Sequence, residues 1–100
     1  MCGAPSQDLD LSGVDLAKEA VIAGIVSRGS DPVAGAYVRL LDSSGEFTAE
    51  VPTSATGQFR FFAAPGTWTV RALAPKAEPV DRLVVVEGIG SVARVDVSVG

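Results

Sequence analysis

The chain has 100 residues, of which 47% are hydrophobic, and its formal net charge is −4. This length predicts one domain with one core, and eight basic residues without a basic cluster argue against nucleic acid as a partner. With no histidine and one cysteine, Ser-His-Asp catalysis, Cys-His catalysis and an internal disulfide are excluded. We therefore expect no enzyme activity and no cofactor.

Residues 1–19 are predicted to be a flexible tail that precedes a folded domain over residues 20–100. The tail has neither the basic start nor the apolar stretch of a secretory signal, and no apolar run is long enough for a membrane helix. These features predict a cytoplasmic location without membrane contact. Asp8, Asp10 and Asp15 do not have the spacing of a calcium-binding loop, so no metal site is expected.

Seven short runs rich in β-branched or alternating apolar residues follow the tail, each separated by turn residues. They are residues 21–27, 36–41, 46–51, two strands within residues 57–72, and residues 83–87 and 93–99. No segment is long enough to supply several crossover helices, so we expect antiparallel pairing. The sequence predicts an all-β fold, a seven-stranded antiparallel Greek-key β-sandwich.

Residues 57–72 contain four of the six aromatic residues of the chain. We expect two strands that pair as a hairpin across a tight Pro65-Gly66 turn. Phe59 and Phe61 alternate onto one face of the first strand, so they are expected to anchor the core. Trp68 is also expected in the core; its alternative role is to stack on a carbohydrate.

Four motifs together resemble the carboxypeptidase-regulatory-like, or prealbumin-like, sandwich domains. They are Ile22-x-Gly24-x-Val26, Pro32-Val33-x-Gly35-Ala36-x-Val38-x-Leu40, Gly57-x-Phe59-x-Phe61 and Pro65-Gly66-x-Trp68-x-Val70. The resemblance covers residues 20–99 and implies a prealbumin-like fold. Hydroxyisourate hydrolases and intradiol dioxygenases of this fold need histidines or paired Tyr and His iron ligands. Tyr37 stands alone, so neither activity is expected.

The chain more narrowly resembles a small actinobacterial family of uncharacterised single domains, domain of unknown function 1416. The motifs are Met1-Cys2-Gly3-Ala4-Pro5, Phe47-Thr48-Ala49-Glu50-Val51 and Phe61-Phe62-Ala63-Ala64-Pro65-Gly66. Members of that family are associated with rhodanese-type thiosulfate sulfurtransferases. The resemblance therefore implies a link to sulfur metabolism and a sulfurtransferase as partner, but no established activity.

Cys2 is the candidate sulfur acceptor. If Met1 is removed, the thiol of Cys2 lies beside an α-ammonium group, which lowers the pKa of that thiol and favours the thiolate. Such a thiolate could take the outer sulfur of a rhodanese persulfide, by the logic of thiol–disulfide exchange. The alternatives are an exposed cysteine without a role, a redox sensor, or an intermolecular disulfide.

Side chains that alternate away from the core form a candidate partner surface with the composition of an interface. They are Tyr37, Arg39, Leu41, Arg60, Phe62 and Arg71. The alternative is an ordinary solvated sheet face with scattered apolar residues. Residues 21–23 and 83–86 are apolar on both faces, so they are either covered twice or paired at the edge of a homo-oligomer.

These observations favour a non-enzymatic accessory domain that docks a sulfurtransferase and accepts sulfane sulfur on Cys2. One alternative is a purely structural or protein-interaction sandwich without chemistry. A weaker alternative is a module that binds a small ligand or a carbohydrate.

Overall fold

A computed structural model describes residues 20–100, in which every regular element is a strand. The expected tail over residues 1–19, with Cys2 and the three aspartates weighed as calcium ligands, lies outside the described residues. No helix among the described residues could cross a membrane. The strands are β1 (Ala20–Arg28), β2 (Asp31–Pro32), β3 (Tyr37–Leu41), β4 (Phe47–Pro52), β5 (Gln58–Ala63), β6 (Gly66–Leu73), β7 (Val80–Val86), β8 (Val92–Arg94) and β9 (Val97–Ser98).

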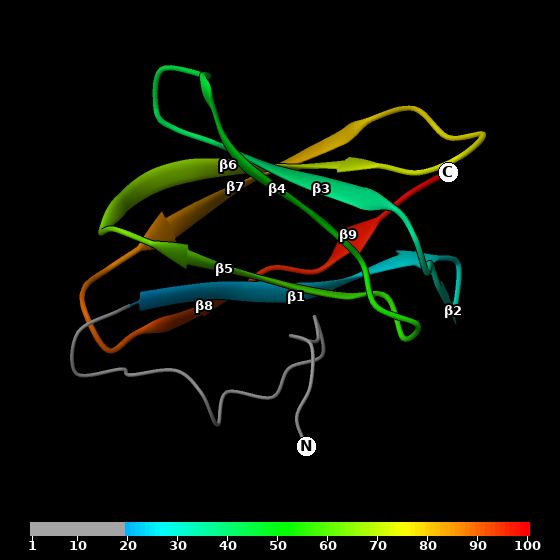
Figure 1. The fold of residues 1–100 in the computed structure, drawn as a ribbon, viewed down its shortest axis with the longest axis horizontal. Coiled ribbons are helices and arrows are strands. Elements are labelled where there is room, and N and C mark those ends of the chain that lie inside the picture. The colour runs from blue at the N-terminus through cyan, green and yellow to red at the C-terminus, as the bar shows by residue number, and fades with distance from the viewer. Residues whose placement is uncertain (1–19) are drawn as a thin grey trace.

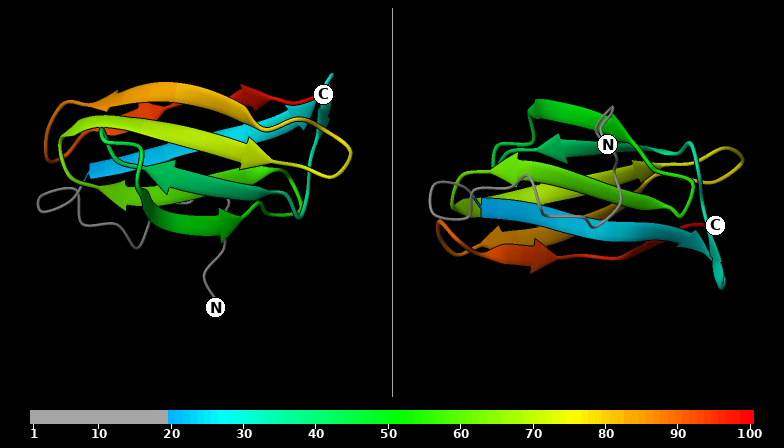
Figure 2. Two further views of the ribbon diagram at one scale, coloured as in Figure 1. Left: turned by 90° about the horizontal axis from the view of Figure 1, so that it is seen from above. Right: turned by 60° about the horizontal axis from the view of Figure 1, so that its bottom comes forward.

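The strands form two sheets that face each other as the layers of a sandwich (Figure 1, Figure 2). A four-stranded sheet has the order β4-β3-β6-β7, and all its pairs are antiparallel. The second sheet is built around β1, which pairs antiparallel with β2 and β5. The predicted all-β sandwich, dominated by antiparallel pairing, is confirmed.

The C-terminal strand pairs in a direction that the sequence did not indicate. The predicted strand over residues 93–99 is present as β8 and β9, and both run parallel to β1. Parallel neighbours need a long crossover between them. No single helix provides it here; instead, all the strands between β1 and β8 form the connection.

The predicted hairpin over residues 57–72 is wrong. Strand β5 pairs with β1, whereas β6 pairs with β3 and β7, so the chain crosses from one sheet to the other at Pro65. Gly66 follows with a φ of 142°, a conformation that favours glycine. The crossing turns the apolar faces of β5 and β6 toward each other across the core. Trp68 Nε1 donates to the Ala64 carbonyl at 2.9 Å and holds this connection, and its half-buried ring packs at the margin of the core.

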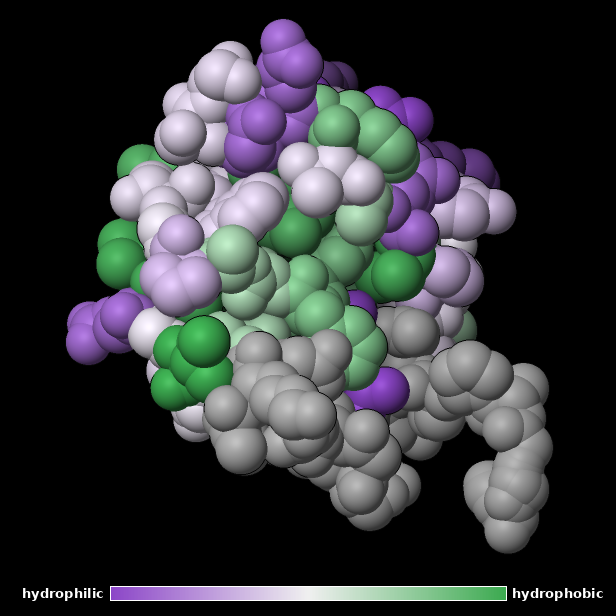
Figure 3. All heavy atoms as spheres, turned by 60° about the vertical axis from the view of Figure 1, so that its left-hand side comes forward, coloured by the Kyte–Doolittle hydropathy of each residue, from purple (hydrophilic) through white to green (hydrophobic). Residues whose placement is uncertain are grey.

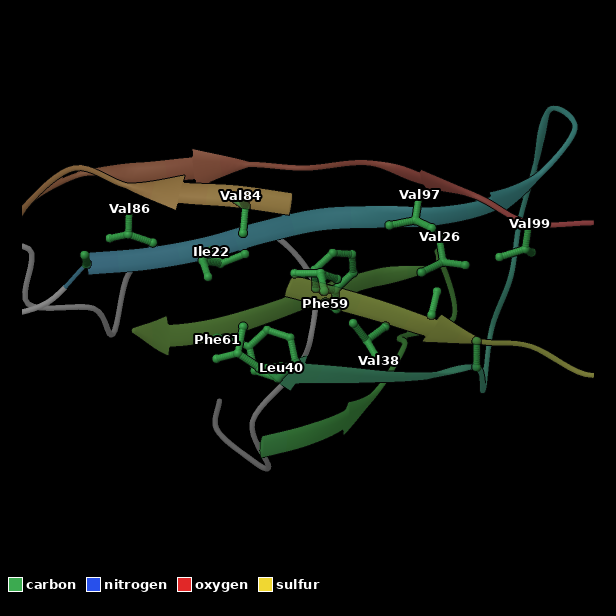
Figure 4. Close-up of a cluster of buried hydrophobic side chains, with 14 residues drawn as sticks. Ile22, Val26, Val38, Leu40, Phe59, Phe61, Val84, Val86, Val97 and Val99 are labelled. Carbon is green, nitrogen blue, oxygen red and sulfur yellow. The ribbon is translucent and has the colours of Figure 1, made fainter. Parts of the chain in front are cut away.

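The core fills the space between the sheets with side chains from both layers (Figure 4). Phe59 is fully buried near its centre, and its ring lies 6.1 Å from that of Phe61 at an interplanar angle of 57°. Such tilted pairs are favourable for aromatic rings. The other large side chains that are fully buried in this core are Ile22, Leu40, Val26, Val38, Val70, Val86 and Val97.

Gly24 lies where β1 meets the break between β8 and β9. A Cβ atom at Gly24 would lie 1.6 Å from the carbonyl oxygen of Val95. On either side of this contact, the Val95 N–H donates to Ala23 O at 2.9 Å and the Ile25 N–H donates to Asp96 Oδ1 at 3.1 Å. The absence of a side chain at Gly24 therefore lets the C-terminal strand approach β1.

We expect Gly24→Ala to lower the free energy of unfolding by about 3 kcal/mol, because backbone atoms must move to admit the methyl group. Urea unfolding would measure the change. Gly88→Ala is the matched control, since a Cβ atom there meets nothing within 4 Å. Equal unfolding midpoints for the two variants would contradict this account of the β1 contact.

Thr53 is a buried polar residue that ties the start of β3 to the end of β4. Its hydroxyl accepts the Ala36 N–H at 2.9 Å and donates to the Val33 carbonyl at 2.6 Å. The backbone N–H of Thr53 also donates to the Ala36 carbonyl at 2.8 Å. The side chain thus satisfies two backbone groups of the loop that joins β2 to β3.

Replacing this hydroxyl by a methyl group in Thr53→Val should cost about 1–3 kcal/mol of stability, because both backbone groups lose their partner. Thr53→Ser keeps the hydroxyl and should lose clearly less. Thermal unfolding of the two variants beside the parent chain measures both effects. A valine variant as stable as the serine variant would show that the hydroxyl does not hold the loop.

Candidate functional site

The structure divides the predicted partner surface between two opposite faces of the sandwich. Tyr37, Arg39, Leu41 and Arg71 belong to β3 and β6 of the four-stranded sheet. Arg60 and Phe62 belong to β5 of the other sheet. These six residues therefore do not make one continuous surface, and each face has to be considered separately. The candidate sulfur acceptor Cys2 lies outside the described residues.

Charged residues cross the outer face of the four-stranded sheet in a single row. The register places Arg39 opposite Glu50 on one side and opposite Arg71 on the other, and Arg71 is opposite Asp81. We call this surface the ladder face. Its residues are Tyr37, Arg39, Leu41, Phe47, Glu50, Thr67, Thr69, Arg71, Asp81, Leu83 and Val85.

Each arginine of the row is neutralised by a carboxylate on its outer side. Arg39 Nε lies 2.7 Å from Glu50 Oε1. Arg71 makes a two-pronged contact with Asp81, through Nε at 2.8 Å and Nη2 at 3.0 Å. Directly opposed like charges destabilise a sheet, so the two carboxylates offset the repulsion between the neighbouring arginines.

The ion pair changes the acidity of Asp81. The hydrogen bond from Arg71 is the main cause that holds the pKa of the Asp81 carboxyl below its usual range; burial opposes it, and the charge of Arg71 adds a smaller lowering effect. The same pair raises the pKa of Arg71 above its already high ordinary value. Arg71 and Asp81 therefore both stay ionised at neutral pH.

An apolar row runs beside the charged one and was only partly predicted. Phe47, Leu41, Thr69 and Leu83 are register partners across all four strands. The alternation of residues 46–51 puts Phe47 on the same face as Ala49 and Val51, but a β-bulge between Leu40 and Leu41 shifts the register and turns Phe47 outward. Phe47 is 61% exposed and Leu83 is 75% exposed, whereas Leu41, predicted to be on the surface, is buried between its neighbours.

Strand β7 extends this apolar area toward the edge of the sheet. Val85 is exposed one row beyond Leu83, opposite Thr67. The signal for this strip was present in the sequence, since residues 83–86 are apolar on both faces. Figure 3 shows the end of the sandwich where β5 leads into β6, with apolar side chains gathered at its middle and polar ones above.

The opposite side of the sandwich carries a smaller apolar strip. Val21 is flanked by Phe62 on β5 and Val92 on β8, and Ala23 is flanked by Arg60 and Arg94. These six residues are called the β1 face. The guanidinium carbon of Arg60 lies 5.6 Å from the centre of the Phe62 ring, a cation–π contact. Arg94 pairs with Asp96 at 2.9 Å.

Neither face has the arrangement of a metal centre. Within residues 20–100, no group of three acidic, cysteine or histidine side chains comes close enough together to hold a metal ion. What the ladder face offers is apolar contact area beside charges that are already paired. That combination suits binding to another macromolecule.

A family model described as "Protein of unknown function (DUF1416)" matches residues 2–99. The chain belongs to this family. The uncharacterised protein Rv0814c of Mycobacterium tuberculosis is 54% identical to this chain over 101 residues, and the match covers 99% of each of the two chains. An uncharacterised protein of Mycolicibacterium smegmatis is 73% identical over 63 residues, covering 62% of this chain and 70% of that protein.

Solved structures of dioxygenases share the fold of this DUF1416 chain. Catechol 1,2-dioxygenase from Pseudomonas arvilla C-1 matches with a TM-score of 0.63 and 11% identity over 88% of this chain, which spans 54% of that enzyme. The dioxygenase domain of a dioxygenase carbohydrate-binding protein fusion from Streptomyces sp. SirexAA-E matches with a TM-score of 0.61 and 14% identity, covering 98% of this chain and 94% of that domain. At such identities the likeness shows the fold alone.

The stability that the Arg71–Asp81 pair contributes should depend on pH. The pKa of Asp81 is lower in the folded protein than in the unfolded chain. The pair therefore stabilises the fold at pH values above the pKa that Asp81 has in the unfolded chain. This contribution is lost as pH falls through the folded pKa. In Arg71→Gln, we expect the carboxyl carbon of Asp81 to titrate at a higher pH by NMR.

Arg39→Gln is the control for this titration, since Arg39 contacts Glu50 and not Asp81. It should leave the Asp81 midpoint nearly unchanged. The stability difference between the parent and Arg71→Gln should also be largest at neutral pH and shrink in acid. An unchanged Asp81 midpoint in Arg71→Gln would refute the assigned cause.

Proposed function

We propose that this protein is a non-enzymatic, cytoplasmic interaction domain that binds a partner protein through the ladder face. The observation that carries the proposal is the exposed apolar strip of Phe47, Leu83 and Val85 beside the paired charges. Interfaces combine aliphatic and aromatic cores with arginines in this way. The four motifs of residues 20–99 support grouping the domain with carboxypeptidase-regulatory-like sandwiches.

Under this proposal the partner is a rhodanese-type thiosulfate sulfurtransferase, and Cys2 accepts sulfane sulfur from it. The support is the resemblance of the Met1-Cys2-Gly3-Ala4-Pro5 opening, together with a family match that begins at residue 2. The Cys2 thiolate attacks the outer sulfur of the cysteine persulfide on the enzyme. A new S–S bond forms at Cys2, the S–S bond on the enzyme breaks, and the enzyme cysteine leaves as a thiolate.

Self-association through β7 is a second candidate, favoured by the position of that strand. Strand β7 is an edge of the four-stranded sheet and exposes Leu83 and Val85. Strand β1 is the other segment that is apolar on both faces. Both of its edges are paired within the chain, so β1 has no open edge for self-association. A carbohydrate-binding role is less favoured, because the Trp68 N–H is occupied by Ala64.

Binding to an actinobacterial rhodanese-type sulfurtransferase, measured by calorimetry, tests the docking proposal. We expect the Leu83→Asp and Val85→Asp double variant to bind at least about tenfold more weakly, a loss of roughly 1.4 kcal/mol. Ile89→Asp is the control, since Ile89 is equally exposed but lies in the β7–β8 turn. No binding by the parent chain, or equal weakening by both changes, would reject the ladder face as the docking surface.

Intact mass spectrometry tests the chemical step. After incubation with the sulfurtransferase and thiosulfate, the parent chain should gain the mass of one sulfur atom, and Cys2→Ser should not. If the two proteins bind but the mass stays unchanged, the docking proposal is retained and the proposed sulfur transfer to Cys2 is rejected.

A further inference from the structure

Strand β7 leaves one of its edges open. Among residues 20–100 it pairs with β6 alone, and that pairing runs along the whole strand. The backbone groups on the other edge of β7 therefore have no strand as partner in the part of the chain that the structure describes. A row of such groups is a template for pairing with a further strand.

The sequence of this edge lacks the features that discourage pairing. Residues 83–86 are all apolar, and their register with β6 is regular. The opposite edge of the same sheet differs, because β4 carries Thr48 as an extra residue against β3 and ends at Pro52. Bulges and prolines protect an edge against a further strand. Association by strand pairing is therefore expected at β7 rather than at β4.

A second copy of β7 can occupy this edge under a simple geometric condition. A two-fold axis perpendicular to the sheet would relate two antiparallel copies and keep both outer faces on the same side. Opposed residues of such strands point to the same face. One residue of β7 therefore has to lie opposite its own copy at the axis, and charge and length select that residue.

Most choices of this residue are unfavourable. With Asp81 or Arg82 at the axis, two like charges would lie directly opposite each other. With Val84 at the axis, Asp81 would lie opposite Glu87. Like charges that are directly opposed destabilise a sheet. With Val85 at the axis, most of each strand would extend beyond the other and remain unpaired.

Leu83 at the axis meets both conditions. All residues of the strand, 80–86, are then paired, and Asp81 lies opposite Val85 of the second copy. No like charges are directly opposed in this register. The apolar row of the ladder face that ends at Leu83 also continues across the axis into the same row of the second copy. The edge is thus complementary to itself.

We propose that the protein forms a two-fold dimer in which β7 pairs antiparallel with β7 of a second copy, with Leu83 opposite Leu83. The two four-stranded sheets then form one continuous sheet, and the two ladder faces form one surface. This inference rests on the self-association named above as the second candidate function, and it is independent of docking to a sulfurtransferase.

The molar mass of the isolated chain in solution tests the dimer. Light scattering after size exclusion should give twice the chain mass of 10.2 kDa. Leu83→Lys places two ammonium groups opposite each other at the axis and should weaken the dimer at least about tenfold. Phe47→Lys is the matched control, since Phe47 is exposed in the same row but lies on β4; it should leave the dimer unchanged.

Disulfide cross-linking tests the register. In a Cys2→Ser background, Leu83→Cys chains oxidised with diamide should form a covalent dimer rapidly, because directly opposed residues lie within the reach of a disulfide. Val85→Cys is the control. Its two copies would be four residues apart along the strands, roughly 14 Å, so it should cross-link several-fold more slowly.

Three results would overturn the proposal. They are a parent chain with the mass of a single chain, growth beyond two chains, and cross-linking at position 85 that is as fast as at position 83. The docking proposal is judged separately, because no sulfurtransferase is present in these experiments. A dimer that does not bind the sulfurtransferase would reject docking alone, and a monomer that binds it would reject the dimer alone.

Discussion

Strand β1 is hydrogen-bonded along both edges and buried on both faces over its first half. Its inward side chains, Ile22 and Val26, belong to the central core, while β5 and the C-terminal strand take up its backbone groups. The four-stranded sheet packs on a layer that exists only because β1 has a partner on each side. The pairing of β1 with the C-terminal strand depends on Gly24, because a side chain at this position would overlap with the Val95 carbonyl.

The strands themselves could be predicted from the sequence because their signals are local. Alternation and turn residues locate each strand to within a few residues, and the burial of Phe59 and Phe61 follows from the same alternation. Pairing partners are not local. The Pro65-Gly66 sequence suits a hairpin turn, but it also suits a crossing between sheets, and only the packing of the apolar faces decides between them.

The outer surfaces were harder to predict for a related reason. One extra residue in a bulge turned Phe47 to solvent and left Leu41 covered, and nothing in the alternation of residues 46–51 signals that shift. The arginines of the ladder face were correctly expected to point outward. That Arg39 and Arg71 lie side by side, each with its own carboxylate, follows from the register, which the sequence does not specify.

The parallel pairing of β1 with β8 and β9 has a consequence for how the protein is made. The backbone N–H of Ile25, near the start of the domain, donates to the side chain of Asp96, which lies 71 residues later in the sequence. During synthesis, one edge of β1 therefore has no neighbour until residues 92–98 have left the ribosome. Such long-range pairing slows folding, and open strand edges promote aggregation. Strands β8 and β9 thus decide whether a newly made chain folds or associates with its neighbours.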